Sequence, residues 1–305
     1  MTGGSEAPAR YSRDLGDDTF AVFLLHGVIR RPAAGGVRNS IGKHLLLERF
    51  EEVLDDLLAC GTPVTVDDAC SGRPLPPRAF AITFDDGFAN NLEVAAPALR
   101  ARRVPAVFYL TTDFVDEGRS SWIDEIEAAL AAAGRFALDL PFGRREGVGD
   151  AAILDLLDEV RRVVKSDRAI DPYDFAGDLV GQLGMRIGEA TRDPELDGKL
   201  TWEQARELAA DPLFTVGGHG MTHRILEHLD DAALRAEIDG SLDLLQARLG
   251  RTLRHYSYPE GLAHCYSDRV IALLRARGIV CAPSAEHGVN RAGDDPFRLR
   301  RITVV

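Results

Sequence analysis

Short apolar segments alternate with amphipathic helical patterns along most of this 305-residue chain, and no other feature restricts its fold as strongly. Such alternation is typical of α/β proteins, in which helices connect parallel strands. Strands are predicted at residues 20–25, 63–66, 79–84, 107–110, 214–216, 255–258, 279–282 and 299–304. Helices are predicted between them, the clearest at residues 45–58, 201–210, 231–249 and 267–277.

The middle of the chain interrupts this alternation. Between residues 119 and 199 the pattern predicts helices, for example at 123–133 and 151–164, but no strand. A structureless loop of this length is not expected inside a compact domain. We therefore predict a mostly helical insertion at about residues 119–200, within a domain that spans residues 19–305. Residues 1–18 are polar and are predicted to form a flexible tail.

The composition excludes several classes of protein. A net charge of −12 argues against a nucleic-acid-binding protein, because affinity for phosphate backbones depends on Lys and Arg. No apolar run approaches the roughly 20 residues that cross a bilayer. The first residues lack the apolar segment of a secretory signal, and the four cysteines show no Cys-x-x-Cys spacing. We expect a cytoplasmic protein with reduced thiols; its oligomeric state is not predicted.

The predicted strand 79–84 ends in Asp85, Asp86 and Gly87. Because neighbouring side chains of a strand point to opposite faces, two adjacent carboxylates at its end do not suit a core. They suit a site if the chain turns there, and Gly87 permits such a turn. One carboxylate can then bind a metal while the other accepts a proton. The alternative is a solvated turn, since Asp and Gly both favour turns.

Two histidines, His219 and His223, follow the predicted strand 214–216 after a pair of glycines. A spacing of four residues places two imidazoles on one side of a helical turn, which suits two ligands of one ion. Neutral imidazole suits Zn²⁺ or another divalent transition metal, and Asp85 or Asp86 can supply a third ligand. A histidine pair at this spacing can also be incidental, but the strand-end aspartates favour a metal site.

Together these motifs resemble those of the polysaccharide deacetylases, the nodulation-deacetylase-like family of carbohydrate esterases (family 4). The segment 83–87, Thr-Phe-Asp-Asp-Gly, is similar to the first motif of that family, and His219-x-x-x-His223 is similar to the second. The resemblance extends over roughly residues 20–304. It implies a distorted (β/α) barrel of about seven strands with a mostly helical insertion. It also implies that Asp85 is the catalytic base and that Asp86, His219 and His223 bind the metal, usually zinc.

A third segment, residues 256–261, resembles the family element that lines the substrate groove and offers a backbone N–H to the oxyanion. The resemblance therefore implies that Tyr258, Pro259 and Glu260 contact substrate. Ser257 stands where many members have Arg, and Glu260 stands where an aromatic residue is common. These departures concern how Asp85 is oriented and what the groove accepts.

Three more residues are candidates for the site. His26 follows the first strand, where sites of parallel barrels are built, and can contact substrate or act as the acid. Arg301 in the last strand is a candidate for substrate binding; it can also pair with Asp85 and lower its pKa, or be a surface residue. Trp122, at the start of the insertion, can stack on a sugar or anchor a helix. The rim segment 39–44 is a possible specificity loop.

The resemblance implies a metal-dependent hydrolase that removes an N-acetyl group from an amino sugar or from an intermediate that contains one. We expect a small cytoplasmic substrate, such as a nucleotide-linked or lipid-linked amino sugar. An alternative is a deformylase or an amidohydrolase of the same family that acts on a non-sugar amide. A non-catalytic carbohydrate-binding descendant is a further alternative, which the intact Asp85, Asp86, His219 and His223 disfavour.

Overall fold

The computed structural model describes residues 11–190 and 193–305, and its centre is a parallel sheet. The strand order is β10-β1-β5-β6-β9, with β4 paired to β5. The strands are β1 (Phe20–Leu25), β4 (Thr62–Pro63), β5 (Ala79–Phe84), β6 (Ala106–Leu110), β9 (Phe214–Gly218) and β10 (Ile302–Thr303). All their pairings are parallel, which confirms the predicted α/β class.

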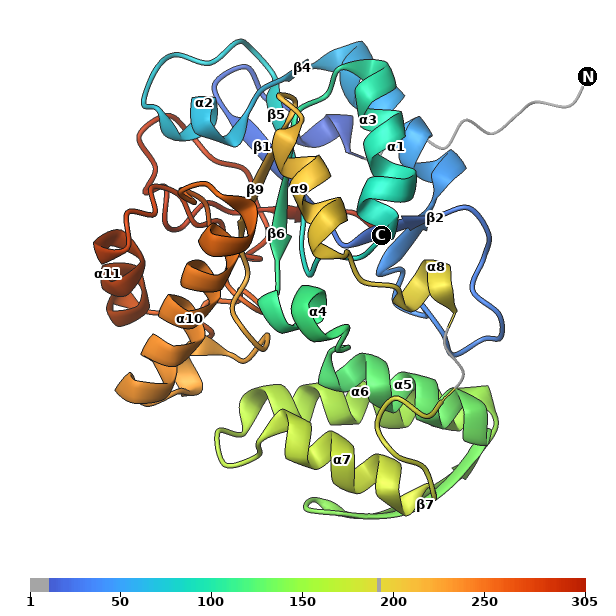
Figure 1. Cartoon of the computed structure of the whole chain (residues 1–305). Helices are drawn as coiled ribbons and strands as arrows, with labels where there is room; N and C mark the ends of the chain where they lie inside the picture. Colours follow the sequence, from blue (N-terminus) through green and yellow to red (C-terminus); the bar gives the residue numbers. More distant parts are fainter. Residues whose placement is uncertain (1–10, 191–192) are drawn as a thin grey trace, which may run out of the picture.

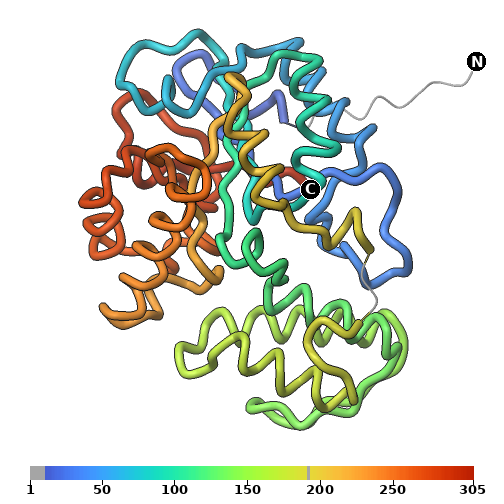
Figure 2. Tube along the Cα trace, in the orientation of Figure 1, coloured from blue at the N-terminus to red at the C-terminus, as the bar shows by residue number. Residues whose placement is uncertain are grey.

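The remaining side of the barrel is irregular. Single parallel bridges join Gly218 to Tyr256 and His255 to Cys281, where the sequence predicts strands at 255–258 and 279–282. Strand β10 pairs with β1, so the C-terminal segment lies beside the first strand of the sheet (Figure 2). The sheet thus curls as a distorted barrel does, with a few isolated bridges in place of two of its strands.

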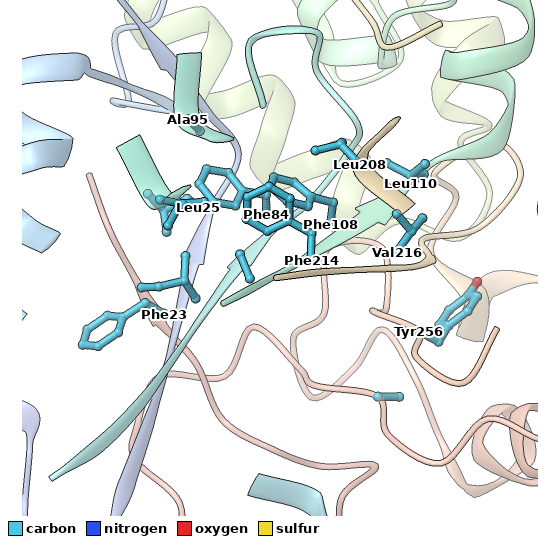
Figure 3. Packing of buried hydrophobic residues seen from close by; sticks show 14 of the residues in the cluster. Phe23, Leu25, Phe84, Ala95, Phe108, Leu110, Leu208, Phe214, Val216 and Tyr256 are labelled. Atoms are coloured by element: carbon cyan, nitrogen blue, oxygen red, sulfur yellow. The ribbon is translucent and has the colours of Figure 1, made fainter. Parts of the chain in front are cut away.

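Most of the helices pack against one face of this sheet in a single hydrophobic cluster, whereas a smaller cluster on the other face includes residues from segments 64–75 and 280–299. Strands buried on both faces are apolar throughout, and every residue of β1 and β5 is buried. At the centre, the rings of Phe84 and Phe108 stack at 5.1 Å, and Phe214 meets Phe108 edge-on at 5.3 Å (Figure 3). The α-helices are α1 (Leu47–Cys60), α2 (Val66–Cys70), α3 (Ala96–Arg102), α4 (Thr112–Glu117), α9 (Trp202–Ala210), α10 (Asp231–Leu249) and α11 (Asp268–Ala276).

Shorter elements complete the barrel domain. A two-stranded sheet pairs β2 (Gly27–Ile29) with β3 (His44–Leu46). A π-helix, η2 (Asn91–Ala95), precedes α3, and short 3₁₀ turns lie at η1 (Ser12–Asp14) and η3 (Leu226–His228). None of the helices in the described ranges is long and apolar enough to cross a membrane.

The inserted segment packs around its own hydrophobic cluster, in the green to yellow part at the bottom of Figure 1. Its elements are α5 (Trp122–Ala133), β7 (Arg135–Leu140), β8 (Gly143–Val148), α6 (Asp150–Ser166), α7 (Pro172–Gln182) and α8 (Pro194–Asp197). The prediction that it contains no strand is wrong, because β7 and β8 form an antiparallel hairpin. The sequence of β7 does carry the alternating pattern of a strand, with buried Phe136, Leu138 and Leu140, and the prediction overlooked it. The sequence of β8 lacks this pattern, because β8 is polar and largely exposed.

The structure also differs from the sequence interpretation near the N-terminus. Residues 1–10 of the predicted tail lie outside the described residues. In the part that follows, Tyr11 and Leu15 are buried in the main hydrophobic cluster, and the hydroxyl of Tyr11 donates to the carbonyl of Val305 at 3.2 Å. Residues 11–15 therefore belong to the packed domain.

Candidate metal and catalytic site

The predicted site residues follow strands that end at the same edge of the sheet. Leu25 of β1 pairs with Phe84 of β5, so His26 and Asp85 leave the sheet side by side. The backbone N–H of Asp85 donates to the carbonyl of Leu25 at 2.9 Å. On the other side, the N–H of His219 donates to the carbonyl of Leu110, the last residue of β6, at 2.9 Å. Parallel strands thus deliver the aspartates and the histidines to one place.

Two of the site residues have a strained backbone conformation. Asp86 has a φ of 77° and His223 a φ of 62°, in the left-handed region that non-glycine residues rarely adopt. Each such residue costs on the order of 1–3 kcal/mol, and such strain concentrates at functional sites. At Asp86 the turn directs two neighbouring carboxylates to different partners.

The residues Asp86, His219 and His223 offer ligand atoms that all lie within 4.8 Å of one another. Oδ1 of Asp86 is 3.5 Å from Nε2 of His219 and 3.3 Å from Nε2 of His223. This oxygen is buried and has no hydrogen-bond partner among the described residues. An unsatisfied buried carboxylate oxygen that faces two imidazole nitrogens fits a divalent metal ion.

The orientation of His219 supports the same conclusion. Its Nδ1 lies 2.8 Å from the carbonyl oxygen of Ser257, which can only accept, so Nδ1 carries the proton and Nε2 is left free for a metal. Burial lowers the pKa of His219 to about 4, so that the neutral imidazole is favoured. The ring of His223 packs against Phe114, with centroids 6.1 Å apart. Both imidazoles are therefore held by their surroundings.

Asp85 has different partners from Asp86. The guanidinium of Arg301 donates to both of its oxygens, at 2.9 Å to Oδ1 and 2.8 Å to Oδ2, and the hydroxyl of Ser257 is 3.2 Å from Oδ2. Burial acts to raise the pKa of Asp85, but Arg301 and His219 outweigh it and hold this pKa below its ordinary value. The carboxylate is thus kept ionised beside the metal ligands.

Arg301 therefore pairs with Asp85 and is too deeply buried to contact substrate. Only 1% of the residue is exposed, and its Nε donates to the carbonyl of Ser284. Position 257, where the family resemblance implies an Arg, is a serine in this sequence. Arg301 of the C-terminal segment instead reaches both Asp85 and the hydroxyl of Ser257, at 2.9 Å.

A cavity of about 300 Å³ opens over these residues. His26, Trp122 and Glu260 line it together with Asp85, Asp86 and both histidines, as expected of residues that contact substrate. The predictions for Tyr258 and Pro259 are corrected, because neither lines the cavity. Tyr258 is fully buried, stacks on Tyr266 and donates to the carbonyl of Phe297 at 2.9 Å. Pro259 is buried as well.

Two charged residues of the site were not singled out from the sequence. Nζ of Lys43, in the predicted rim segment, lies 3.0 Å from Oδ2 of Asp86 and 3.2 Å from Asp124 at the start of the insertion. Burial acts to raise the pKa of Asp86, but Lys43 and His223 hold it well below its ordinary value. Lys43 and Asp124 are 81 residues apart, so no local spacing could have indicated the pair.

A parallel α/β barrel with two histidines and an aspartate at its carboxyl edge, next to a second buried aspartate, is typical of metal-dependent hydrolases. The family model described as Polysaccharide deacetylase matches residues 72–282, more than half of the chain. The chain belongs to the polysaccharide deacetylase family. The matched range contains Asp85, Asp86, His219 and His223, whereas His26 and Arg301 lie outside it.

Solved structures of several deacetylases have a similar fold. The Streptococcus pyogenes deacetylase PplD in complex with acetate is 14% identical, with a TM-score of 0.59 over 94% of this chain and 92% of that chain. IcaB from Ammonifex degensii is 18% identical, with a TM-score of 0.59 over 95% and 94% of the two chains. The BpsB deacetylase domain from Bordetella bronchiseptica is 18% identical, with a TM-score of 0.54 over 95% and 97%. A search of curated proteins found no match.

Proposed function

We propose that this protein is a metal-dependent N-deacetylase that hydrolyses the acetamido group of an amino sugar. The observation that carries the proposal is the position of the ionised Asp85 beside a second carboxylate, Asp86, that faces His219 and His223. Membership of the family supports an acetylated sugar as substrate. The cavity of about 300 Å³ is at the lower end of the range for small-molecule sites, roughly 300–1,000 Å³, and favours a single sugar residue.

The donor set favours Zn²⁺ at Asp86, His219 and His223, because imidazole and carboxylate in a three-residue set leave a position open. When bound, such an ion supplies Lewis acidity, which polarises the acyl carbonyl and makes water more acidic. Lys43 holds the second oxygen of Asp86 at 3.0 Å and thereby leaves the first oxygen to the ion.

Asp85 then acts as the base. Its oxygens are fixed by Arg301 and Ser257, so it can accept the proton of the attacking water without a change of side-chain position. A backbone N–H near Glu260 holds the oxygen of the carbonyl as negative charge develops on it. The proton that the departing amine requires is the one that Asp85 took from the water. His26 lines the same cavity, and because burial lowers its pKa it is neutral and relays this proton to the amine.

The test is a panel of N-acetylated and N-formylated amino sugars and non-sugar amides, with the released amine and acid measured for the zinc-loaded protein. We expect acetate from N-acetyl sugars, and no turnover by Asp85→Asn although this variant still binds one equivalent of zinc. Near-normal turnover by Asp85→Asn contradicts the assignment of the base. Release of formate but not acetate identifies a deformylase, and stoichiometric zinc without any hydrolysis supports a binding protein.

A further inference from the structure

A second cavity, of about 230 Å³, lies next to the metal site and takes no part in the proposed reaction. It lies between residues 164–172, at the junction of α6 and α7, and residues 223–229, which follow the second histidine. Four residues line both cavities, namely Trp122, Lys165, His223 and Glu260. These four side chains therefore form the wall between the two cavities.

An ion pair across this wall joins the insertion to the barrel. Nζ of Lys165, near the end of α6, lies 2.6 Å from Oε2 of Glu260, which follows the irregular strand 255–258. The two side chains are only 31% and 16% exposed. Glu260 has a φ of 61°, so a strained backbone presents its carboxylate to the lysine. Trp122, another residue of the wall, is held by packing, since it is 3% exposed and belongs to the hydrophobic cluster of the insertion.

The second cavity offers the groups that a neutral sugar residue requires. Arg224 and Asp171 form an ion pair at 2.8 Å on its wall and present both donors and acceptors to hydroxyl groups. Ile170, Ile225 and Leu229 supply apolar surface for the C–H faces of a sugar ring. Of the three Lys and Arg side chains that line the cavity, Arg224 and Lys165 are paired with carboxylates, whereas Arg168 is exposed. A sugar linked to a diphosphate is therefore the competing occupant that the experiment must distinguish.

We propose that the ion pair of Lys165 and Glu260 limits the length of the substrate, because it closes the metal site off from a second cavity that would otherwise hold the sugar residue attached to the acetylated one. This inference rests on the proposed function, because it assigns the length of the same substrate. With the wall in place, the metal site accepts a single amino-sugar residue. Without it, the two cavities join and a longer saccharide can occupy both.

Two substitutions at Lys165 test the wall, since the long aliphatic part of the side chain fills space and its charge makes the ion pair. Lys165→Ala removes both, whereas Lys165→Met keeps most of the volume without the charge. Both residues are good helix formers, and a partly exposed ion pair contributes little to stability, so both variants are expected to fold. The measurement is kcat/KM of the zinc-loaded full chain for N-acetylglucosamine methyl glycoside and for the N-acetylglucosamine trimer.

We expect Lys165→Ala to raise the ratio of kcat/KM, trimer over monosaccharide, by about tenfold, in the range that steric discrimination supplies. Lys165→Met should leave the ratio unchanged. An unchanged ratio in Lys165→Ala overturns the proposal, as does a wild-type protein that already prefers the trimer. A gain by Lys165→Ala for a uridine-diphosphate-linked sugar, without one for the trimer, also overturns the neutral-sugar subsite.

Failure of the proposed function gives a different result. If the zinc-loaded wild-type protein hydrolyses no acetylated sugar, the deacetylase assignment is wrong. The effect of the wall on access to the second cavity is then tested by measuring the binding of the trimer. Trimer titrations, followed by the fluorescence of Trp122 in proteins that also carry Trp202→Phe, must show tighter binding to Lys165→Ala than to Lys165→Met. Equal binding, or none, overturns the subsite as well.

Discussion

Asp85 and Asp86 are adjacent in the sequence and are each paired with a cation, but they have different partners. Asp85 is clamped by Arg301, whereas one oxygen of Asp86 is held by Lys43 and the other faces two imidazoles. The difference arises from the backbone, because the strand ends at Phe84 and the φ of 77° at Asp86 turns the second carboxylate away. Two identical side chains can thus carry out two separate tasks.

Replacement of Arg301 by Met should destabilise the protein strongly. The substitution leaves the carboxylate of Asp85 buried without its cation, and breaking a buried ion pair from one side costs about 3–5 kcal/mol. The measurement is the free energy of unfolding by denaturant, with kcat/KM recorded in parallel. We expect activity to fall as well, since Asp85 loses both bonds from Arg301 and keeps only the contact with Ser257.

The neighbouring residue provides the control. Arg300 is exposed, and surface substitutions of this kind usually change stability by less than about 0.5 kcal/mol. Arg300→Met should therefore resemble the wild-type protein. Equal losses in the two variants would show that the clamp on Asp85 has no special role.

At this scale the sequence predicted the aspartates and histidines because they follow apolar strands in recognisable motifs. The structure brings Asp86, His219 and His223 together as predicted. Tyr258 was assigned to the wrong side of its segment, since an irregular strand does not fix which side chains face the cavity. Lys43 became part of the site only through folding, which joins it to Asp124 of the insertion.

At the scale of elements, helix α5 connects the insertion to the site, and its start is fixed by a cap. The side chain of Ser121 accepts the N–H of Asp124 at 3.2 Å, at the helix end that carries Trp122 into the cavity. Helix α9 begins with a similar bond, from the N–H of Gln204 to Thr201, away from the cavity. Loss of either cap should destabilise the protein by about 1 kcal/mol.

Only one of these caps should matter for catalysis. Ser121→Ala frees the start of α5, so we expect a lower kcat/KM in addition to the loss of stability. Thr201→Ala should show the same loss of stability with kcat/KM unchanged. The two variants are compared by chemical denaturation and steady-state kinetics. An equal effect of the two substitutions on kcat/KM would show that the start of α5 has no special role in catalysis.

The helices were predicted better than the strands. The capping pattern at Thr201 and the glycine that follows α10 mark helix ends locally, and both helices occur where the sequence indicated. The hairpin β7–β8 was missed, because β8 is stabilised by pairing with β7 and not by an apolar face of its own. A strand of this kind exists through its partner and leaves little pattern in the sequence.

At the scale of the whole molecule, the site is assembled from two parts of different character. The barrel contributes the metal ligands and Asp85, while the insertion contributes Trp122, Asp124 and Lys165 to the cavity wall. The parallel α/β architecture could be predicted from the alternation of apolar segments with helical patterns, and the barrel form from the resemblance to the family. The shape of the cavity could not, since it depends on how the insertion packs across the strand ends.

Metal binding should therefore stabilise the entire fold, because its ligands come from two distant segments, at Asp86 and at His219 and His223. An ion that binds the native state alone contributes about 2.7 kcal/mol at one hundred times its dissociation constant. For a chain of this length we expect zinc to raise the Tm by about 5 °C over the protein treated with a chelator. Asp86→Ala should lose this shift because it lacks a ligand, whereas Asp85→Asn should keep it. A shift retained by Asp86→Ala would place the ion elsewhere, and its loss in Asp85→Asn would make Asp85 a ligand instead of the base.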